Sequence, residues 1–285
     1  MMEKKLIINA DDFGLSQSIN EGILVGIQKK IIRSVSLFAN APKTHDAVEI
    51  VKACPDVDIG VHLTLTQTRA TSSPEKIPSL ITKEGAFVPN IQALAKKMFF
   101  DQLDFQEIYK EFERQIVKIS GSGINVSHLD TNQHVHLHPK IFYIVLSLAK
   151  KYNIKYVRIP CETPRSLKDY LGTNNFIKSI ISINKWFYIR LLRKNKLQSA
   201  NRFLGLYCAG RLNLSCLLDI LSYVKEGVTE LCCHPGWDDN EVASGYGGSF
   251  QGYGWAQELT ALLSDDFQSA LKERMIELTN FTDMK

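Results

Sequence analysis

Short apolar stretches of strand length alternate with amphipathic stretches of helical length along most of this chain. Short buried strands separated by amphipathic helices are typical of a parallel sheet, and most economically of a barrel. We therefore expect one α/β domain over residues 1–285, barrel-like, with about seven parallel strands. The expected strands are residues 6–8, 35–38, 59–65, 124–129, 155–159, 204–208 and 229–233.

The composition is that of an ordinary soluble protein, with 45% apolar and 22% charged residues among 285. The first apolar run is too short for a signal peptide, and no run approaches the length of a membrane span. The six cysteines lack CxxC or zinc-ribbon spacing, which favours reduced thiols. We therefore expect a cytoplasmic protein.

Residues 124–139 combine a predicted strand with an unusual density of ligand-type side chains. A helix is expected over 104–120, and the glycines that follow should end it before the strand. A single histidine here would most simply be a hydrogen-bonded core residue. Four histidines beside a carboxylate favour a functional site, because buried imidazoles are costly unless paired. These residues are His128, Asp130, His134, His136 and His138.

Polar residues also end three other predicted strands. Asp11 and Asp12 close the first strand, His62 lies on the third, and His234 follows the last. Taken singly, the aspartates could be a helix cap and turn pair, and His62 could be a core histidine. Adjacent carboxylates at a strand end point in different directions, so one can bind a metal while its neighbour acts as a base. Their coincidence at matching strand ends favours one shared site.

Five ordered motifs resemble the YdjC-like carbohydrate deacetylases, a family with chitooligosaccharide and hopanoid-biosynthesis-associated members. The resemblance covers most of the chain, and residues 205–212 and the Gly-Tyr-Gly-Trp run ending at Trp255 are most similar to the hopanoid-associated branch. The motifs are NADDFGLS (9–16), GVHLTLT (60–66), SHLDTNQHVHLHP (127–139), VRIPCE (157–162) and CHPG (233–236).

The resemblance implies a barrel-like α/β fold and metal-dependent removal of an N-acetyl group from an amino sugar, which could be carried on a lipid. It implies Asp12 and His62 as metal ligands, Asp11 as general base and His234 as the acid. Two alternatives stay open: a catalytically silent relative that binds sugar, and another hydrolase or phosphatase on the same ligand set.

One position departs from the family pattern. Asn132 stands where the family has a histidine that is the third metal ligand. A carboxamide oxygen suits a hard cation, so Mg²⁺ is the expected metal, with Mn²⁺ or Zn²⁺ as alternatives. His134 could take the ligand position instead if the loop shifts.

Other polar residues of the motifs are candidates for supporting roles. Asp130 or Asp238 could orient a histidine, as carboxylates behind metal sites do, and His128 belongs to the same supporting group. Arg158 and Glu162 could hold sugar hydroxyls, with a structural ion pair as the alternative for either residue.

Residues 170–218 contain eight Lys or Arg and no Asp or Glu. Within them, residues 177–197 mix aromatic, aliphatic and cationic side chains, and we expect a basic amphipathic insertion around 170–202. Such a segment indicates contact with a membrane surface or an acidic ligand; the alternative is a core-packed helix with a solvated basic face. Nucleic acid is not an expected partner, because no binding motif accompanies the charge.

Overall fold

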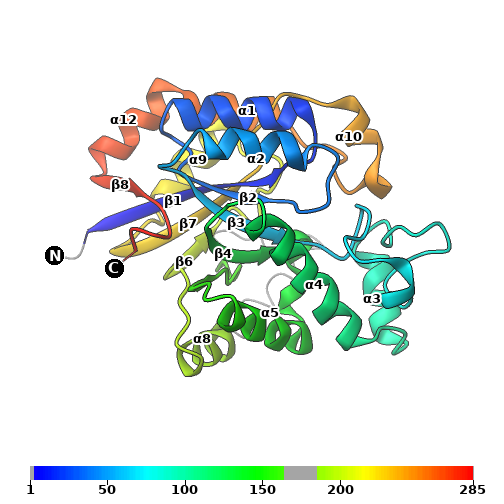
Figure 1. The fold of residues 1–285 in the computed structure, drawn as a ribbon. Coiled ribbons are helices and arrows are strands. Elements are labelled where there is room, and N and C mark those ends of the chain that lie inside the picture. The colour runs from blue at the N-terminus through cyan, green and yellow to red at the C-terminus, as the bar shows by residue number, and fades with distance from the viewer. Residues whose placement is uncertain (1–2, 164–184, 285) are drawn as a thin grey trace.

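Eight strands form one sheet in which every pairing between strands is parallel, in a computed structural model that describes residues 3–163 and 185–284. Seven of them follow the order β5-β4-β3-β2-β1-β7-β6, and β8 pairs with β1. The predicted barrel-like α/β fold is therefore confirmed (Figure 1). The strands are β1 (Lys4–Phe13), β2 (Ser34–Leu37), β3 (Asp58–Leu63), β4 (Val126–Thr131), β5 (Tyr156–Val157), β6 (Arg202–Leu204), β7 (Gly227–Cys233) and β8 (Ile276–Thr279).

The sheet is organised around β1, which pairs with β7 along one edge. Its other edge is shared, because β8 pairs with Lys4 to Ile7 and β2 with Asn9 to Phe13. The two ends of the sheet approach each other through an isolated parallel bridge between Tyr156 of β5 and Gln198, just before β6. The sheet thus curls into a barrel-like shape whose two ends approach each other at this bridge.

Alternation along β1 gives the barrel its two layers of packing. Leu6, Ile8 and Ala10 belong to the main apolar core. The intervening residues take the other face, where Ile7 joins a small apolar cluster and Asn9 belongs to a buried polar network. Apolar and polar side chains therefore share the second face of the strand, with the polar ones nearer its carboxyl end.

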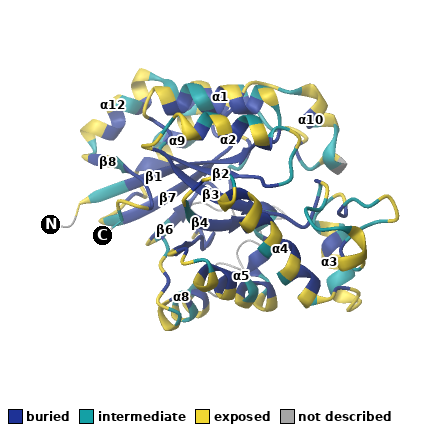
Figure 2. Cartoon of the chain, in the orientation of Figure 1, coloured by how far each residue is buried: buried dark blue, intermediate teal, exposed yellow. Residues whose placement is uncertain are grey.

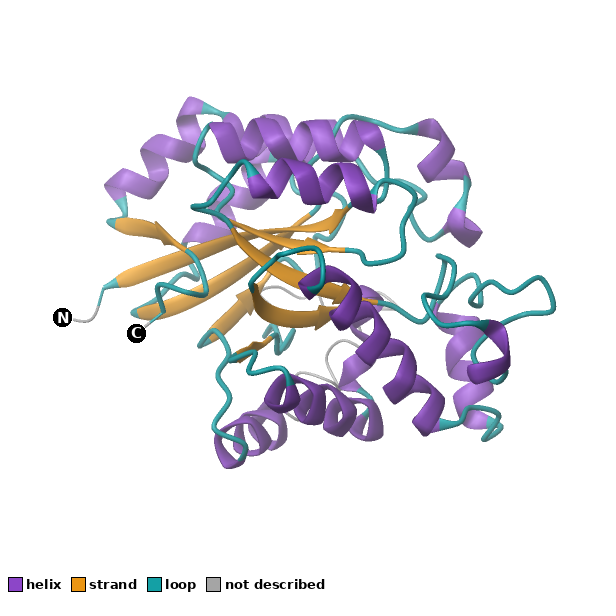
Figure 3. Ribbon diagram, viewed as in Figure 1, coloured by secondary structure: helices purple, strands orange, loops and turns teal. Residues whose placement is uncertain are grey.

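Helices cover the outside of the curled sheet. In Figures 1 and 3, α1, α2, α9 and α12 lie on one side of it, and α4, α5 and α8 on the other. Figure 2 shows strands that are almost entirely buried and helices with one exposed face. The helices are α1 (Gln17–Gln28), α2 (Thr44–Lys52), α3 (Ile91–Phe99), α4 (Phe105–Ser120), α5 (Pro139–Lys151), α8 (Lys185–Lys194), α9 (Leu214–Leu221), α10 (Asn240–Ser244), α11 (Trp255–Leu263) and α12 (Asp265–Glu273).

The helix predicted over 104–120 is α4, and its ends have local causes. Asp104 caps it by accepting a hydrogen bond from the Gln106 backbone at 2.7 Å, and Gly121 follows its last residue. Its buried face includes Phe112 and Ile116, at the predicted helical spacing. The next helix, α5, begins at Pro139, as expected of proline in the first turn.

The long segment between β3 and α3 folds back on itself. Bridges join Thr66 to Val88 and Arg69 to Ala86. The buried carboxylate of Glu111 on α4 accepts hydrogen bonds at 2.8 Å from the backbones of Thr71 and Ser72 in this segment. The helix α4 therefore anchors the loop that follows the third strand.

The basic segment predicted around 170–202 lies partly outside the described residues. Its described part is α8, whose Tyr188 and Leu192 are buried, together with the chain that leads into β6. Among the described residues, no helix is both long and apolar enough to cross a membrane.

Candidate active site

Polar side chains gather at the carboxyl ends of the strands, where parallel α/β folds form their sites. They come from β1, from β3 and from the segments that follow β4 and β7, and they line a pocket of about 300 Å³. All the residues predicted as catalytic groups or metal ligands line this one pocket: Asp11, Asp12, His62, Asn132, His134 and His234.

A larger hollow, of about 480 Å³, lies at the opposite end of the strands. Asp58, the first residue of β3, and Asn125, just before β4, are part of its lining. Because the predicted chemical groups all line the smaller pocket, we assign the candidate active site to that pocket.

Arg158, directly after β5, has a fully buried side chain next to this pocket. Its Nη1 lies 2.6 Å from Asp11 Oδ2 and 2.7 Å from Asp130 Oδ2, and its Nη2 lies 2.7 Å from Asp11 Oδ1. Its Nε donates to Glu230 at 2.6 Å. The structure therefore has Arg158 in the ion pair that the sequence left open as the alternative to a sugar contact.

The Arg158 guanidinium decides the charge of two of these carboxylates. Burial alone would raise the pKa of Asp11, but the charge and hydrogen bonds of Arg158 hold it well below its ordinary value. Burial opposes ionisation of Asp130 too, yet Arg158 and His62 lower its pKa to about 2. Both carboxylates are therefore ionised at neutral pH.

Asp11 accepts a full set of hydrogen bonds. Besides the two from Arg158, its Oδ1 accepts from Asn9 Nδ2 at 2.7 Å and its Oδ2 from the Cys232 thiol at 3.2 Å. A carboxylate offers about four acceptor positions, so these partners occupy all of them. The weakest partner is the thiol, which is the one that a substrate or water would displace.

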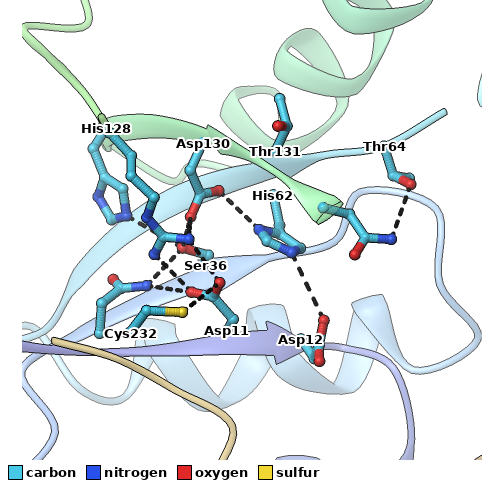
Figure 4. A network of polar contacts seen from close by, with 12 residues as sticks. Asp11, Asp12, Ser36, His62, Thr64, His128, Asp130, Thr131 and Cys232 are labelled. Atoms are coloured by element: carbon cyan, nitrogen blue, oxygen red, sulfur yellow. Dashed lines mark hydrogen bonds and ion pairs between the residues drawn. The ribbon is translucent and has the colours of Figure 1, made fainter. Parts of the chain in front are cut away.

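His62 is held in one orientation between two carboxylates (Figure 4). Its Nδ1 lies 2.8 Å from Asp130 Oδ1, and its Nε2 lies 3.7 Å from Asp12 Oδ1. Asp130 also accepts from the Ser36 hydroxyl at 2.6 Å, which fixes the carboxylate itself. Asp130 thus has the position expected of a carboxylate that orients a metal-binding histidine.

Asp12 and His62 fit a divalent cation. The 3.7 Å between Asp12 Oδ1 and His62 Nε2 is too long for a hydrogen bond, but it suits two ligands that each lie about 2.1 Å from one ion. Asp12 Oδ2 is buried without a hydrogen-bond partner within the described chain. Burial raises the pKa of Asp12 to about 7, so this carboxylate lacks a neighbouring cation sufficient to keep it ionised.

Other groups of ligand-type atoms also converge here. Asp11, His62 and Asp130 bring one atom each to within 4.8 Å of one another, as do Asp11, Cys232 and His234. Both groups include Asp11, whose charge Arg158 already neutralises. We therefore consider the Asp12 side of the pocket the better cation site.

Asn132 begins η2 (Asn132–Leu137), the turn after β4. Its Nδ2 donates to the Thr64 and Thr66 hydroxyls, at 3.4 Å each, and to Gln67 Oε1. This leaves its Oδ1, the atom that a hard cation would take, for a ligand. Nearby His134 is half-buried, and its buried Nδ1 has no hydrogen-bond partner among the described residues. Both alternatives for the third ligand are therefore structurally available.

Four residues that line the pocket have left-handed backbone, which side chains other than glycine rarely adopt. Their φ angles are 63° at Asp12, 70° at Gln67 and 54° at both Gln133 and His134. Such conformations cost on the order of 1–3 kcal/mol each and persist only where surrounding structure enforces them. The pocket lining is thus locally strained, both at Asp12 near the end of β1 and in the turns that follow β3 and β4.

His234 lies just after β7 and is held by α11. Its backbone N–H donates to Glu258 Oε2 at 2.6 Å, and its ring Nδ1 lies 4.0 Å from the same oxygen. The ring packs edge-on against Tyr253, with centroids 5.1 Å apart. Burial lowers the pKa of His234 to about 4, so the imidazole is neutral at pH 7.

Like Asp130 and Arg158, the other three residues predicted for supporting roles lie outside the pocket lining. His128 is fully buried and stacks on Phe281, 4.1 Å between centroids, with Ser36 Oγ 3.4 Å from its Nε2. Asp238 is exposed and accepts from the backbone of Ala256 in α11, so it steadies a helix rather than a histidine. Glu162 is buried and accepts from the backbone of Leu206 at 2.7 Å.

Sequence reasoning missed several lining or supporting residues. Gln67 directly follows the GVHLTLT motif and lines the pocket, but a lone glutamine carries no spacing signal. Tyr253 belongs to the Gly-Tyr-Gly-Trp run, which was noted only as a branch feature. Glu230 was detectable, because a carboxylate inside a predicted buried strand needs a cationic partner. Glu258 lies on α11, a helix that was not predicted.

The chain is similar to known proteins over nearly its whole length. The family model for YdjC-like protein matches residues 5–273. The carbohydrate deacetylase of Thermoanaerobacter pseudethanolicus is 30% identical over 99% of this chain and 100% of its own. That of Clostridium beijerinckii is also 30% identical, over 98% of this chain and 100% of its own.

Solved structures extend the likeness to the fold. An Enterococcus faecalis protein, provisionally named a cellobiose-phosphate cleavage protein, is 28% identical, with 98% of both chains covered and a TM-score of 0.78. A lactam utilization protein of Thermus thermophilus shares the fold alone, at 13% identity and a TM-score of 0.52, over 96% of this chain and 98% of its own.

The Arg158 cluster predicts a large loss of stability on substitution. Arg158→Met should lower the free energy of unfolding by about 3–5 kcal/mol at pH 7, because it leaves buried carboxylates without their cation. The low pKa values of Asp11 and Asp130 in the folded protein contribute stability above about pH 3.9, and this contribution disappears toward pH 2. The loss of stability caused by Arg158→Met should therefore become smaller as pH falls. Urea unfolding across this pH range measures both effects.

The matched control is Arg33→Met. Arg33 pairs with Asp283 at 3.6 Å, and both side chains are partly exposed, so its loss should cost at most about 1 kcal/mol. Equal costs for the two substitutions, or a cost for Arg158→Met that does not change with pH, would contradict the role assigned to the buried cluster.

Proposed function

Because the chain belongs to the YdjC-like protein family, we propose that it is a carbohydrate deacetylase that removes the N-acetyl group of an amino sugar with the help of a divalent metal. The observation that carries this proposal is the convergence of Asp11, Asp12, His62 and His234 on one pocket at the carboxyl ends of the strands. The relatives named carbohydrate deacetylase, aligned over nearly the whole chain, support the same activity.

Asp12 and His62 would hold the metal, with Asn132 or His134 as the third ligand. A carboxylate and a carboxamide oxygen favour Mg²⁺ or Mn²⁺ over Zn²⁺. When bound, such a cation polarises the acetamide carbonyl and lowers the pKa of water. Asp130 serves this arrangement by fixing the His62 ring through Nδ1, which leaves Nε2 directed at Asp12.

Asp11 would take the proton from the attacking water. Arg158 keeps this carboxylate ionised, so it is in the form that a base needs. Its weakly bound neighbour, the Cys232 thiol, would turn away from Oδ2 to free an acceptor position. A charge-paired carboxylate is a weak base, which means that orientation rather than basicity is its main contribution.

His234 would deliver a proton to the departing amine nitrogen. It rests neutral because burial lowers its pKa to about 4. The proton would therefore come from the water that attacks, and Asp11 is close enough to pass it on, with an oxygen within 4.8 Å of the His234 ring. Hydrolysis then balances: water and the amide give an amine and acetate.

The pocket suits one sugar residue with its acetamide. Its volume of about 300 Å³ is at the lower end of small-molecule sites. Gln67 Nε2 and His134 Nδ1 are buried and lack hydrogen-bond partners within the described chain, so a substrate that brings hydroxyl or carbonyl groups would satisfy them. An amino sugar carries both groups, whether free or linked to a lipid.

The direct test is release of acetate from N-acetylated chitooligosaccharides in the presence of Mg²⁺, Mn²⁺ or Zn²⁺. We expect acetate and free amine in equal amounts. Cellobiose phosphate is the comparison substrate, because release of phosphate or glucose from it instead would support another hydrolase. Sugar binding by calorimetry without acetate release under any metal would support the silent relative.

A matched pair of variants should distinguish the roles of the two adjacent aspartates. Asp11→Asn should keep the metal but lose turnover by at least about 10²-fold, as expected on removal of a general base. Asp12→Asn should weaken the metal itself. Metal titration and acetate release on both variants provide the measurement, and equal loss of metal in the two would refute the division of roles.

The third ligand is decided by two further variants. If Asn132 is the ligand, Asn132→His should tighten metal binding by at least the roughly 10–100-fold that supporting residues contribute. If His134 is the ligand, Asn132→His should leave metal affinity unchanged and His134→Ala should remove the metal. If the parent protein and both variants all fail to bind metal, the result would support the catalytically silent relative.

We also propose that α8 binds the surface of anionic membranes, which would place the active site near a lipid-linked sugar substrate. Trp186 is 76% exposed and Phe187 41% exposed, while Arg190, Arg193 and Lys194 are exposed on the same helix. Aromatic side chains beside cations suit the interface of an anionic bilayer, where the rings insert and the cations meet headgroups.

Reversal of Arg190, Arg193 and Lys194 to Glu should abolish co-sedimentation with vesicles that contain phosphatidylserine at low salt. Each cation contributes about 1 kcal/mol near such a surface, so loss of the three amounts to roughly 10²-fold in binding. Pure phosphatidylcholine vesicles should bind neither form. Absence of binding by the parent protein would end this part of the proposal.

The control reverses three exposed cations elsewhere on the surface, at Lys29, Lys225 and Lys272. It makes the same change in net charge, so it should retain more binding than the α8 variant. Equal loss in both variants would indicate a general charge effect instead of a contact made by α8.

A further inference from the structure

Two cysteines meet beside the pocket. Cys208 lies in the segment after β6 and Cys216 in the first turn of α9, and their sulfur atoms are 2.7 Å apart. A disulfide bond measures about 2.05 Å, so little movement separates this contact from a bond. Both residues are half-buried, so a dissolved oxidant can reach them. Cys161, Cys232 and Cys233 are buried instead.

The segment that carries Cys208 forms one wall of the pocket. Gly205, Leu206 and Ala209 line the pocket, and Gly210 packs so closely on Tyr253 that a Cβ there would lie 2.5 Å from the ring. Tyr253 in turn contacts the ring of His234. A covalent link at Cys208 would therefore act on a wall of the pocket.

The same segment is joined to the site at its other end. The backbone of Leu212 donates to Glu258 Oε1 at 3.1 Å, and the second oxygen of that carboxylate accepts from the His234 backbone. Residues 205–212 are thus fastened at Leu212 and rest on Tyr253 at Gly210, with Cys208 between the lining residues. Oxidation would add a covalent restraint at this middle point.

We propose that Cys208 and Cys216 form a redox-active dithiol that closes to a disulfide and stiffens the pocket wall formed by residues 205–212. The oxidant is a hydroperoxide. One thiolate attacks a peroxide oxygen, the O–O bond breaks, and a sulfenic acid and an alcohol or water result. The second sulfur then forms the S–S bond and releases water. Two thiols lose two electrons and two protons, and the peroxide gains them.

Peptide mapping tests the proposal on the full chain. Trypsin cleaves after Arg211, between the two cysteines, so oxidised protein should yield residues 203–211 joined to residues 212–225, lighter by two hydrogens than the two reduced peptides. Iodoacetamide labelling should disappear at both cysteines after hydrogen peroxide and return after dithiothreitol. Cys54 should stay available for labelling on unfolding throughout.

Three variants and a treatment in denaturant serve as controls. Cys208→Ser and Cys216→Ser should each abolish the linked peptides, while Cys54→Ser should leave them unchanged. The same treatment in denaturant tests whether the fold is responsible, because residues so close in sequence also meet in an unfolded chain. Linkage no faster in the folded protein than in denaturant, or peroxide products confined to other cysteines, would overturn the proposal.

The effect on the pocket wall has its own readout. Amide hydrogen exchange in residues 205–212 should slow on oxidation of the parent protein and stay unchanged in oxidised Cys208→Ser. Linked peptides with unchanged exchange would refute the stiffening while leaving the dithiol intact. Neither measurement depends on acetate release, so the result stands apart from the proposed deacetylase activity.

Discussion

The contact on which the site depends is the one between Arg158 and its carboxylates. A fully buried guanidinium is costly to desolvate, and Asp11, Asp130 and Glu230 compensate it from three other strands. Its backbone carbonyl also accepts from His136 Nε2 at 2.9 Å, which joins the short β5 to the turn after β4. One residue therefore ties together the strand ends that present the pocket.

This arrangement divides the buried carboxylates into two electrostatic groups. Asp11 and Asp130 are held ionised by Arg158, whereas burial raises the pKa values of Asp12 and Glu230 to about 7. Glu230 already contacts Arg158, so Asp12 is the carboxylate that faces the pocket without a strong cationic partner. Asp12 is thus the carboxylate whose ionisation a bound divalent cation would favour.

Periodicity predicted the framework well because strands and helices of this fold follow local rules. The helix capped by Asp104, the first-turn Pro139 and the strand that carries His128 and Asp130 were all predictable from neighbours in sequence. The partners of those side chains were not. The stacking of His128 on Phe281 and the ion pairs of Arg158 with three acids join residues that are far apart in the chain. The pattern of one sequence does not show which distant residues come into contact.

The left-handed backbone at four residues of the pocket creates a trade-off between the stability of the fold and the function of the site. These residues are Asp12, Gln67, Gln133 and His134. Glycine at any of these positions would relax the main chain, yet it would delete a side chain that lines the pocket. Selection for thermal stability alone would therefore favour substitutions that remove side chains of the site. A more thermostable variant that keeps all four residues would have gained its stability elsewhere, most simply in the helices that cover the barrel.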